Sequence, residues 1–212
     1  NHMKFQNWTP ELAYFLGWMI TDGYVSPQGI HVEIASKDKE SLDHLHKWIP
    51  ESFLLGPYKR IKDGKETESF RLSVYGAEVK EIFSKQWGIS DNKTGREHIP
   101  FEVPEKIVPH LFRGLFDGDG GCTERDNNKH ESYFVSSSRK LLEDIRDIHG
   151  GNKGRKIRTK KELKRKKKNG EARRFMYAWE FGKKESRKLR DLIYVDGYYG
   201  MSRKKEKMFR LF

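Results

Sequence analysis

The sequence predicts an α+β protein made of two pseudo-symmetric repeats, and three observations carry this prediction. Residues 12–23 and 111–120 contain a similar motif, an apolar helix-like run that is interrupted by a glycine and closed by an Asp-Gly pair. The interrupting glycines are 97 residues apart, and so are the closing acids Asp22 and Asp119. Each motif is followed by the same succession of helical and alternating segments. A duplication at one fixed period implies two equivalent halves, each of which ends a helix in a carboxylate.

The first half is expected to have the order helix, hairpin, helix, hairpin, helix. Its first helix begins near Thr9-Pro10, because threonine is a good N-cap and proline suits the first helical position, and it stops at Asp22-Gly23. Apolar and polar residues alternate over 24–26 and 30–36, which predicts a hairpin with one buried face. Apolar spacing and an Asp-Gly turn predict the rest: a helix over 37–49, strands over 58–62 and 65–75, and a helix over 77–86.

The second half is expected to repeat this order. It has a helix that ends at Asp119, a hairpin about Asn127-Asn128, a helix over 138–148, strands over 156–163 and 173–181, and a helix over 186–193. When Gly76 is aligned with Gly182, Glu180 takes the place of the apolar Val74. A slip of one residue would exchange the two faces of the last strand, and so its register stays open. We expect residues 4–98 to form the N-terminal repeat, residues 99–212 the C-terminal repeat, and residues 1–3 to be left over from cloning.

The composition points to a polyanionic partner. The chain carries 43 Lys and Arg against 31 Asp and Glu, a formal net charge of +12 in 212 residues, which makes nucleic acid the first candidate. No apolar run approaches a transmembrane length, and so a membrane partner is not expected. Because Cys122 is the only cysteine, an intramolecular disulfide and a cysteine-based zinc site are excluded. We therefore expect an intracellular protein of the cytoplasm, the nucleoid or an organelle matrix.

Small residues recur every four positions on both duplicated helices, a pattern that is typical of close helix packing. If the helices pack along these rows, their C-terminal ends coincide and Asp22 lies near Asp119. Two close carboxylates repel each other, and each helix end adds unpaired carbonyl oxygens and the negative end of a dipole. A hard divalent cation, Mg²⁺, satisfies all of these groups and is suited to act on a phosphate. The small residues are Ala13, Gly17, Thr21, Gly114 and Gly118.

The motifs at 17–23 and 114–120 resemble the two signature helices of the LAGLIDADG homing endonucleases, in the single-chain form that carries both motifs. The helix and hairpin order of each half is also similar to the αββαββα repeat of that family. The resemblance implies that the last acid of each motif, Asp22 or Asp119, binds the essential metal and cleaves one DNA strand. It also implies that the carbonyl groups of Thr21 and Gly118 are further metal ligands.

One position departs from the family pattern, and two lysines agree with it. Ile20 stands where the motif has its first acid, a place that Asp117 fills in the second copy. The resemblance implies a lysine near each active site, and Lys93 and Lys204 stand in similar contexts. Such a lysine stabilises charge on the reacting phosphate or holds a hydrolytic water, and a solvated surface charge is the alternative for either one. Mg²⁺ is the expected cofactor, with Mn²⁺ as a substitute and Ca²⁺ as an ion that binds without supporting cleavage.

Positive charge is concentrated in one segment of the second half. Between residues 153 and 168 there are eleven Lys or Arg and one acid. The turn and strand that follow indicate one arm of a long hairpin, whose width and charge fit the major groove of DNA. Cations on the groove side neutralise phosphates there, while other side chains contact base edges. Strand parity nominates Glu33, Arg60, Arg71 and Ser73 in the first half, and Arg158, Lys160 and Arg173 in the second.

These observations and the resemblance together predict a monomeric, Mg²⁺-dependent DNA endonuclease whose antiparallel sheets form a saddle over double-stranded DNA. It is expected to be a homing endonuclease, intron-encoded or free-standing, that breaks both strands of a long asymmetric target and leaves short 3′ overhangs. Two alternatives use the same scaffold. One is a maturase that binds intron RNA, and the other is a DNA-binding regulator without catalysis.

Overall fold

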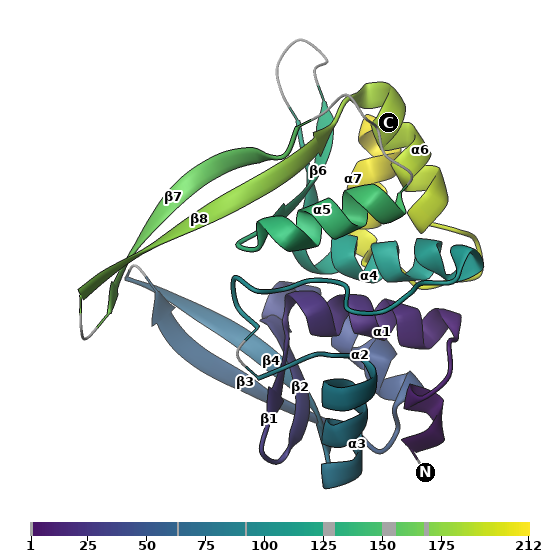
Figure 1. Ribbon diagram of the computed structural model, residues 1–212, viewed down its shortest axis with the longest axis vertical. Coiled ribbons are helices and arrows are strands. Elements are labelled where there is room, and N and C mark those ends of the chain that lie inside the picture. The colour runs from purple at the N-terminus through teal and green to yellow at the C-terminus, as the bar shows by residue number, and fades with distance from the viewer. Residues whose placement is uncertain (1, 63, 92, 125–129, 150–155, 168–169) are drawn as a thin grey trace.

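The computed structural model describes residues 2–62, 64–91, 93–124, 130–149, 156–167 and 170–212, and it shows two parts of matching architecture (Figure 1). The first repeat consists of η1 (His2–Phe5), α1 (Pro10–Thr21), β1 (Gly23–Ser26), β2 (Gly29–Ala35), η2 (Ser36–Asp38), α2 (Lys39–Trp48), β3 (Phe53–Lys62), β4 (Lys65–Tyr75), α3 (Ala77–Glu81) and η3 (Ile82–Gln86). The second repeat consists of η4 (Glu105–Ile107), α4 (Val108–Asp119), β5 (Gly120–Thr123), β6 (Glu131–Ser136), α5 (Arg139–Ile148), β7 (Arg158–Lys167), β8 (Gly170–Phe181), α6 (Lys183–Ile193) and α7 (Ser202–Leu211).

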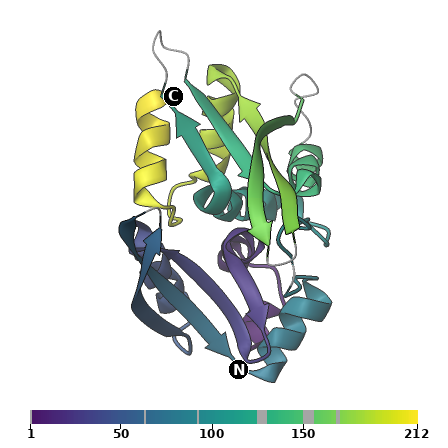
Figure 2. The ribbon, with the colours of Figure 1, turned by 90° about the vertical axis from the view of Figure 1, so that its left-hand side faces the viewer.

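Each repeat contains a four-stranded antiparallel sheet. The strand order is β1-β2-β4-β3 in the first repeat and β5-β6-β8-β7 in the second. The long hairpins β3–β4 and β7–β8 project from the same side of the molecule, and in the perpendicular view the strands of both sheets face the viewer (Figures 1 and 2). The predicted α+β fold of two αββαββα repeats is therefore confirmed, with α7 as an addition.

Helix α1 lies at the centre of the molecule, beside α4 (Figure 1). It begins as expected: the Thr9 hydroxyl oxygen accepts a hydrogen bond from the Leu12 backbone nitrogen at 3.1 Å, and Pro10 takes the first helical position. Every residue from Leu12 to Ile20 is buried, because this helix packs against α4 as well as against its own sheet. Burial of this almost wholly apolar helix contributes to the hydrophobic stabilisation of both repeats.

Strand pairing settles the register that the sequence left open. The ladders of β2 with β4 and of β6 with β8 make Trp179 the counterpart of Leu72, and both side chains are 1% exposed. The alignment that placed Glu180 at a buried position was therefore wrong by one residue. Its physical cause is that the two aligned glycines are not equivalent, since φ is 137° at Gly76 and −73° at Gly182.

The structure differs from the expected elements in two further places. Strand β3 begins at Phe53, ahead of the predicted start, and its ladder with β4 is irregular between Leu55 and Tyr58. Helix α7 was not predicted, because its many cations conceal the few apolar residues that it buries. The expected turn at Asn127-Asn128 lies outside the described residues. Within the described ranges, no helix combines the length and the apolar character that crossing a membrane requires.

Candidate active site

The C-terminal ends of α1 and α4 meet, as the rows of small residues predict. A methyl group on Gly17 would lie 2.5 Å from the backbone of α4, and one on Gly118 would lie 2.0 Å from the Thr21 hydroxyl oxygen. The helices therefore pack backbone to backbone where Gly17 meets Gly114, and one turn later Gly118 lies against the side chain of Thr21. Asp22 and Asp119 directly follow the contact between Thr21 and Gly118, and so both acids lie at one seam between the repeats.

The two carboxyl groups at this seam interact electrostatically. Asp22 keeps an exposed surface and Asp119 is half-buried, although protein atoms displace much of the water around both. Desolvation raises the pKa of Asp22, while the ammonium groups of Lys204 and Lys93 oppose this shift. Desolvation, followed by repulsion from Asp22, raises the pKa of Asp119 to about 7. Cations close by favour the state in which both acids are ionised.

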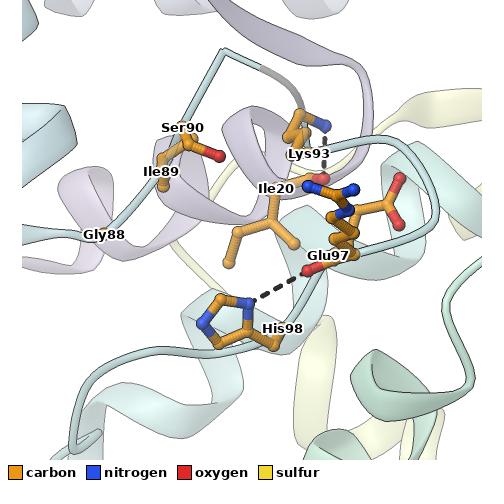
Figure 3. A pocket seen from close by; sticks show the side chains of 8 residues that line it. Ile20, Gly88, Ile89, Ser90, Lys93, Glu97 and His98 are labelled. Atoms are coloured by element: carbon orange, nitrogen blue, oxygen red, sulfur yellow. Dashed lines mark hydrogen bonds between the residues drawn. The ribbon is translucent and has the colours of Figure 1, made fainter.

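Both predicted lysines lie at the ends of the paired helices. Lys93 Nζ donates to the carbonyl oxygens of Ile20 and Thr21 at 2.6 and 2.7 Å, and Figure 3 shows its side chain directed at the end of α1, beside a cavity of about 20 Å³. Lys204 Nζ donates to four carbonyl oxygens at the end of α4, at distances from 2.6 to 2.9 Å. Each ammonium therefore satisfies orphan carbonyls and the negative end of a helix dipole. Desolvation lowers the pKa of both lysines.

The predicted metal ligands surround the seam, but the structure already engages two of them. The carbonyl oxygens of Thr21 and Gly118 accept hydrogen bonds from Lys93 and Lys204. A carbonyl oxygen has two lone pairs, so each retains one acceptor position. In the described part of the chain, no group of three or more His, Cys, Asp or Glu side chains is placed to hold a metal ion, and a metal here would use two carboxylates, main-chain oxygens and water. An all-oxygen set of this kind suits a hard cation such as Mg²⁺.

Asp117 is a buried acid whose contacts no sequence pattern reveals. Its carboxylate accepts hydrogen bonds from the hydroxyls of Tyr14 and Tyr194, each at 2.9 Å, and from the Met201 backbone nitrogen at 2.8 Å. The residue is 1% exposed, and burial raises its pKa. These bonds join α4 to α1 and to the segment that leads to Lys204. The available signal was a charged residue within an apolar helical run.

The beginning of α7 is attached to the first repeat. The backbone nitrogen and the hydroxyl of Ser202 donate to Glu40 at 2.9 and 3.0 Å, and Arg203 makes two hydrogen bonds of 3.0 Å with Asp38. A cavity of about 210 Å³ lies beside these contacts and is lined by residues of both repeats, Asp38 and Lys204 among them. The position of Lys204 therefore depends on both repeats, which explains why sequence reasoning did not find its supports.

On the first sheet, the predicted DNA-binding residues Glu33 and Arg71 form one network. Arg71 Nη2 donates to the Glu33 carboxylate at 2.7 Å. The guanidinium of Arg71 also lies 4.9 Å from the ring centre of Tyr58 and 5.7 Å from that of Tyr24. These four side chains come from adjacent strands and are on the face opposite to the buried Leu72. Glu33 and Arg71 are therefore on the face of the sheet that strand alternation predicted for them.

Two other candidates of the first repeat have different outcomes. Arg60 pairs with Thr67 in the ladder of β3 and β4, at the parity of Arg71, as expected. Ser73 has no exposed surface, because its hydroxyl is hydrogen bonded to His31 Nδ1 at 2.8 Å beneath neighbouring side chains. A buried hydroxyl of this kind does not meet DNA, and the nomination of Ser73 is corrected.

On the second sheet, Arg158 and Lys160 are exposed as predicted. Lys160 Nζ lies 4.2 Å from the ring centre of Tyr133. The ladder of β7 and β8 shifts its register next to Lys160, and such a bulge exchanges the two faces of a strand. Arg173 is six residues from the buried Trp179 along β8, and so both occupy positions on the same face of the strand. Ala178, which pairs with Arg158, is at a position on the other face. The parity argument that nominated Arg173 was therefore off by one residue.

Comparisons with known proteins agree with this architecture. Residues 109–194 match the sequence profile of the LAGLIDADG-like domain. A comparison with curated protein sequences gives no match. Among solved structures, the homing endonuclease I-WcaI bound to its DNA recognition sequence is similar, with a TM-score of 0.57 and 13% sequence identity over 96% of this chain and 91% of that one.

Two structures of DUF199/WhiA are similar to nearly the same degree. The full-length protein from Thermatoga maritima has a TM-score of 0.54 and 13% identity, over 95% of this chain and 59% of that one. Its N-terminal LAGLIDADG domain has a TM-score of 0.53 and 12% identity, over 96% of this chain and 87% of that one. At these identities the likeness shows the fold alone. The chain carries a LAGLIDADG-like domain in its second repeat and has, over both repeats, the fold that LAGLIDADG homing endonucleases and WhiA share.

Proposed function

We propose that this protein is a Mg²⁺-dependent homing endonuclease that acts as a monomer on double-stranded DNA. One strand is cut at Asp22 and the other at Asp119, in a long asymmetric target, and short 3′ overhangs are left. The observation that carries the proposal is the meeting of these two acids at the ends of paired helices, each with a lysine bound beside it. The fold is shared with WhiA, and so the assignment depends on this site.

The residues at the seam fit a divalent cation. Desolvation raises the pKa of both carboxyl groups, and repulsion from Asp22 adds to the shift of Asp119, so a cation bound between them would favour the state in which both are ionised. The adjacent carbonyl oxygens of Thr21 and Gly118 already accept from ammonium cations, so the helix ends are built to hold positive charge. When bound, Mg²⁺ supplies a Lewis acid and a lowered pKa for a water nucleophile. Asp22, Asp119 and these two carbonyls would hold it.

The chain's own residues supply the rest of the chemistry. Lys93 and Lys204 keep an ammonium group within hydrogen-bond reach of the helix ends, where it stabilises the negative charge that develops on a pentavalent phosphate. Asp117 holds the Met201 amide and so positions the segment that carries Lys204. The exposed surface of Asp22 leaves the seam open to a phosphodiester backbone.

The two repeats differ in sequence, and this difference sets the symmetry of the target. Identical repeats would contact identical half-sites and require a palindrome. Here the paired strands of the two sheets place different residues at matching positions, Leu72 against Trp179 and Arg71 against Ala178. The preferred target is therefore asymmetric.

Two alternatives on the same scaffold predict different behaviour. An RNA-binding intron maturase would bind structured intron RNA more tightly than any duplex DNA. A DNA-binding regulator would have no use for the metal site, and its binding and biological effect would not depend on Asp22 or Asp119. The presence of both acids and both lysines at one seam favours the endonuclease over the regulator.

The test starts from a randomised duplex library, from which substrates cut in the presence of Mg²⁺ are selected. The selected site is placed in a supercoiled plasmid and treated with the Asp22→Asn and Asp119→Asn variants. We expect either change to abolish double-strand cleavage while DNA binding is kept or improved, since each removes a negative charge near phosphate. Asp196→Asn, at an exposed position in a different segment, is the matched control and should cut normally. Double-strand cleavage by both seam variants would show the assignment to be wrong.

A further inference from the structure

Positive charge is distributed unevenly between the repeats. With the boundary that we propose after residue 98, residues 4–98 contain 13 Lys and Arg and 14 Asp and Glu. Residues 99–212 contain 30 Lys and Arg and 17 Asp and Glu. The whole positive excess of the chain therefore belongs to the second repeat, although both repeats present a similar sheet on the same side of the molecule (Figure 2).

The exposed cations of the second sheet are arranged for contact with phosphates. Arg158 and Lys160 are exposed at the beginning of β7, where the long hairpin leaves the body of the molecule (Figure 1). The ammonium of Lys160 lies 4.2 Å from the ring centre of Tyr133 in a cation–π contact, while the residue stays exposed. Phosphate contacts of this kind give affinity with a steep salt dependence and no sequence information.

The corresponding face of the first sheet has a paired arginine near its centre, while Arg60 and Lys65 lie farther out on the long hairpin. The Glu33 carboxylate accepts from Arg71 Nη2 at 2.7 Å and from the Ser69 hydroxyl at 2.8 Å. Tyr24 and Tyr58 lie against the same guanidinium, and the side chain of Arg71 is only 26% exposed.

A braced arginine of this kind is suited to a base edge. Its Nε and Nη2 each direct one N–H to Glu33, which fixes the plane of the guanidinium and leaves the two N–H groups of Nη1 and the second N–H of Nη2 as donors. Guanine presents two acceptors, O6 and N7, in the major groove, and arginine is the commonest side chain that contacts them. Because the braced geometry is set before binding, little side-chain entropy is lost when a base is contacted.

We propose that the two repeats divide the work of DNA binding: the second holds the phosphates, and the first discriminates between bases through Arg71 braced by Glu33. This inference rests on the proposed function, because it assumes a duplex DNA partner. It assigns most of the salt-dependent affinity to the strongly basic repeat. It also assigns a preference for guanine at one position of the first half-site to Arg71.

The test compares matched variants of the full chain on two readouts. The first readout is the slope of log Kd against log salt on a mixed-sequence 40-bp duplex, where each lost phosphate contact lowers the slope by roughly 1. The double change Arg158→Gln with Lys160→Gln should lower the slope by about 2. Arg60→Gln with Lys65→Gln, which removes the same charge from the Arg71 face of the first sheet, should leave the slope nearly unchanged.

The second readout is base preference, obtained by selecting bound duplexes from a randomised library. Arg71→Lys keeps the charge and the salt slope but loses the planar donors, and it should reduce the preference for guanine at one position by roughly tenfold or more. Glu33→Gln should have the same effect in weaker form, because it loosens the brace. The Arg158 and Lys160 variant should keep every base preference.

The outcomes separate this inference from the function on which it rests. Equal losses of salt dependence from the two double variants, or an unchanged base preference in Arg71→Lys, would overturn the division of work while duplex binding itself persists. Failure of the unaltered chain to bind any duplex would overturn the proposed function as well. Thermal unfolding of each variant, with a midpoint close to that of the unaltered chain, verifies that the fold is intact.

Discussion

Replacing Gly114 by alanine should separate the two central helices. In an isolated helix the same change stabilises, because alanine exceeds glycine in helix propensity by about 1 kcal/mol. In this structure a methyl group at Gly114 would lie 2.2 Å from the Tyr14 carbonyl oxygen and 3.0 Å from the Gly17 Cα. Both neighbours belong to the backbone of α1, which has no side-chain rotation with which to make room. The tertiary contact and the local helix propensity therefore predict changes of opposite sign in the free energy of unfolding.

The size of the destabilisation follows from how far the two helices must move apart to accommodate the methyl group. Ordinary contacts of a Cβ begin at 3.4 Å, so α1 and α4 must move apart by about 1 Å at this point. Overpacking in a tightly packed interior costs about 1–3 kcal/mol, which exceeds the gain in helix propensity. We expect a net loss of about 1–2 kcal/mol in the free energy of unfolding, which lowers the thermal midpoint of a chain of this size by about 2–8 °C.

The effect on cleavage should be larger than the effect on stability. The same helix pair carries Asp22 and Asp119 at its ends, and a displacement of reacting groups by about 1 Å can cost on the order of 10²-fold in rate. The assays are thermal unfolding and single-turnover cleavage of a selected substrate. Gly17→Ala should behave in the same way, since its methyl group would lie 2.5 Å from the α4 backbone.

An exposed helical position gives the control for this prediction. Glu206→Ala, on the solvent side of α7, adds a strong helix former without touching the interface and should leave both the midpoint and the cleavage rate near their original values. If Gly114→Ala melts at or above the midpoint of the unaltered protein and cleaves at the same rate, the helices do not meet backbone to backbone and the reasoning is refuted.

Three further predictions concern the groups around the seam. The pKa of Asp119 is raised to about 7, mainly by desolvation, so the folded state holds this proton more tightly than the unfolded chain, whose value is about 4. The resulting stabilisation is complete below about pH 4 and is lost as the pH rises through about 7, and in melts with EDTA from pH 5 to 8 this loss should vanish in Asp119→Asn. No difference in pH dependence between the two proteins would contradict this assignment. Asp117→Ala leaves three buried donors without their acceptor and should lower the free energy of unfolding by roughly 2–5 kcal/mol in denaturant titrations, whereas Asp117→Asn, which keeps acceptor oxygen, should cost less. Equal stability of all three proteins would argue against the network. Lys93→Met and Lys204→Met should each reduce cleavage at least tenfold, because each removes the only ammonium that is bound at its helix end in the part of the chain described. DNA affinity should be nearly unchanged, because the chain keeps many other cations. Retained cleavage would make these lysines purely structural caps.

Much of the architecture was predictable because it depends on local chemistry. The Thr9-Pro10 start, the apolar run of α1 and the closing Asp22-Gly23 follow from capping, periodicity and turn preference, and the structure confirms each. The fixed period between the two motifs was enough to indicate two repeats. The rows of small residues were enough to indicate that the helices pack together and that Asp22 approaches Asp119.

Several features of the site lay beyond the sequence. Ser73 is buried and hydrogen bonded to His31 on a neighbouring strand, and strand alternation alone makes no distinction between an exposed and a covered residue of one face. The faces of the second sheet depend on a bulge beside Lys160 and on a register that two nonequivalent glycines had obscured. Such shifts cost little locally, and no composition signal marks them.

The sequence by itself determined the pair of motifs, the acids that close them and the excess of positive charge, because each of these is written in residue type and spacing, whereas the two lysines were nominated from the family resemblance. Only the tertiary structure decided that Lys93 and Lys204 bind the helix-end carbonyls and that Asp117 is fully enclosed by Tyr14, Tyr194 and the Met201 amide. The reason is physical: these contacts join segments distant in the chain, and their geometry exists only after both repeats have packed against one another.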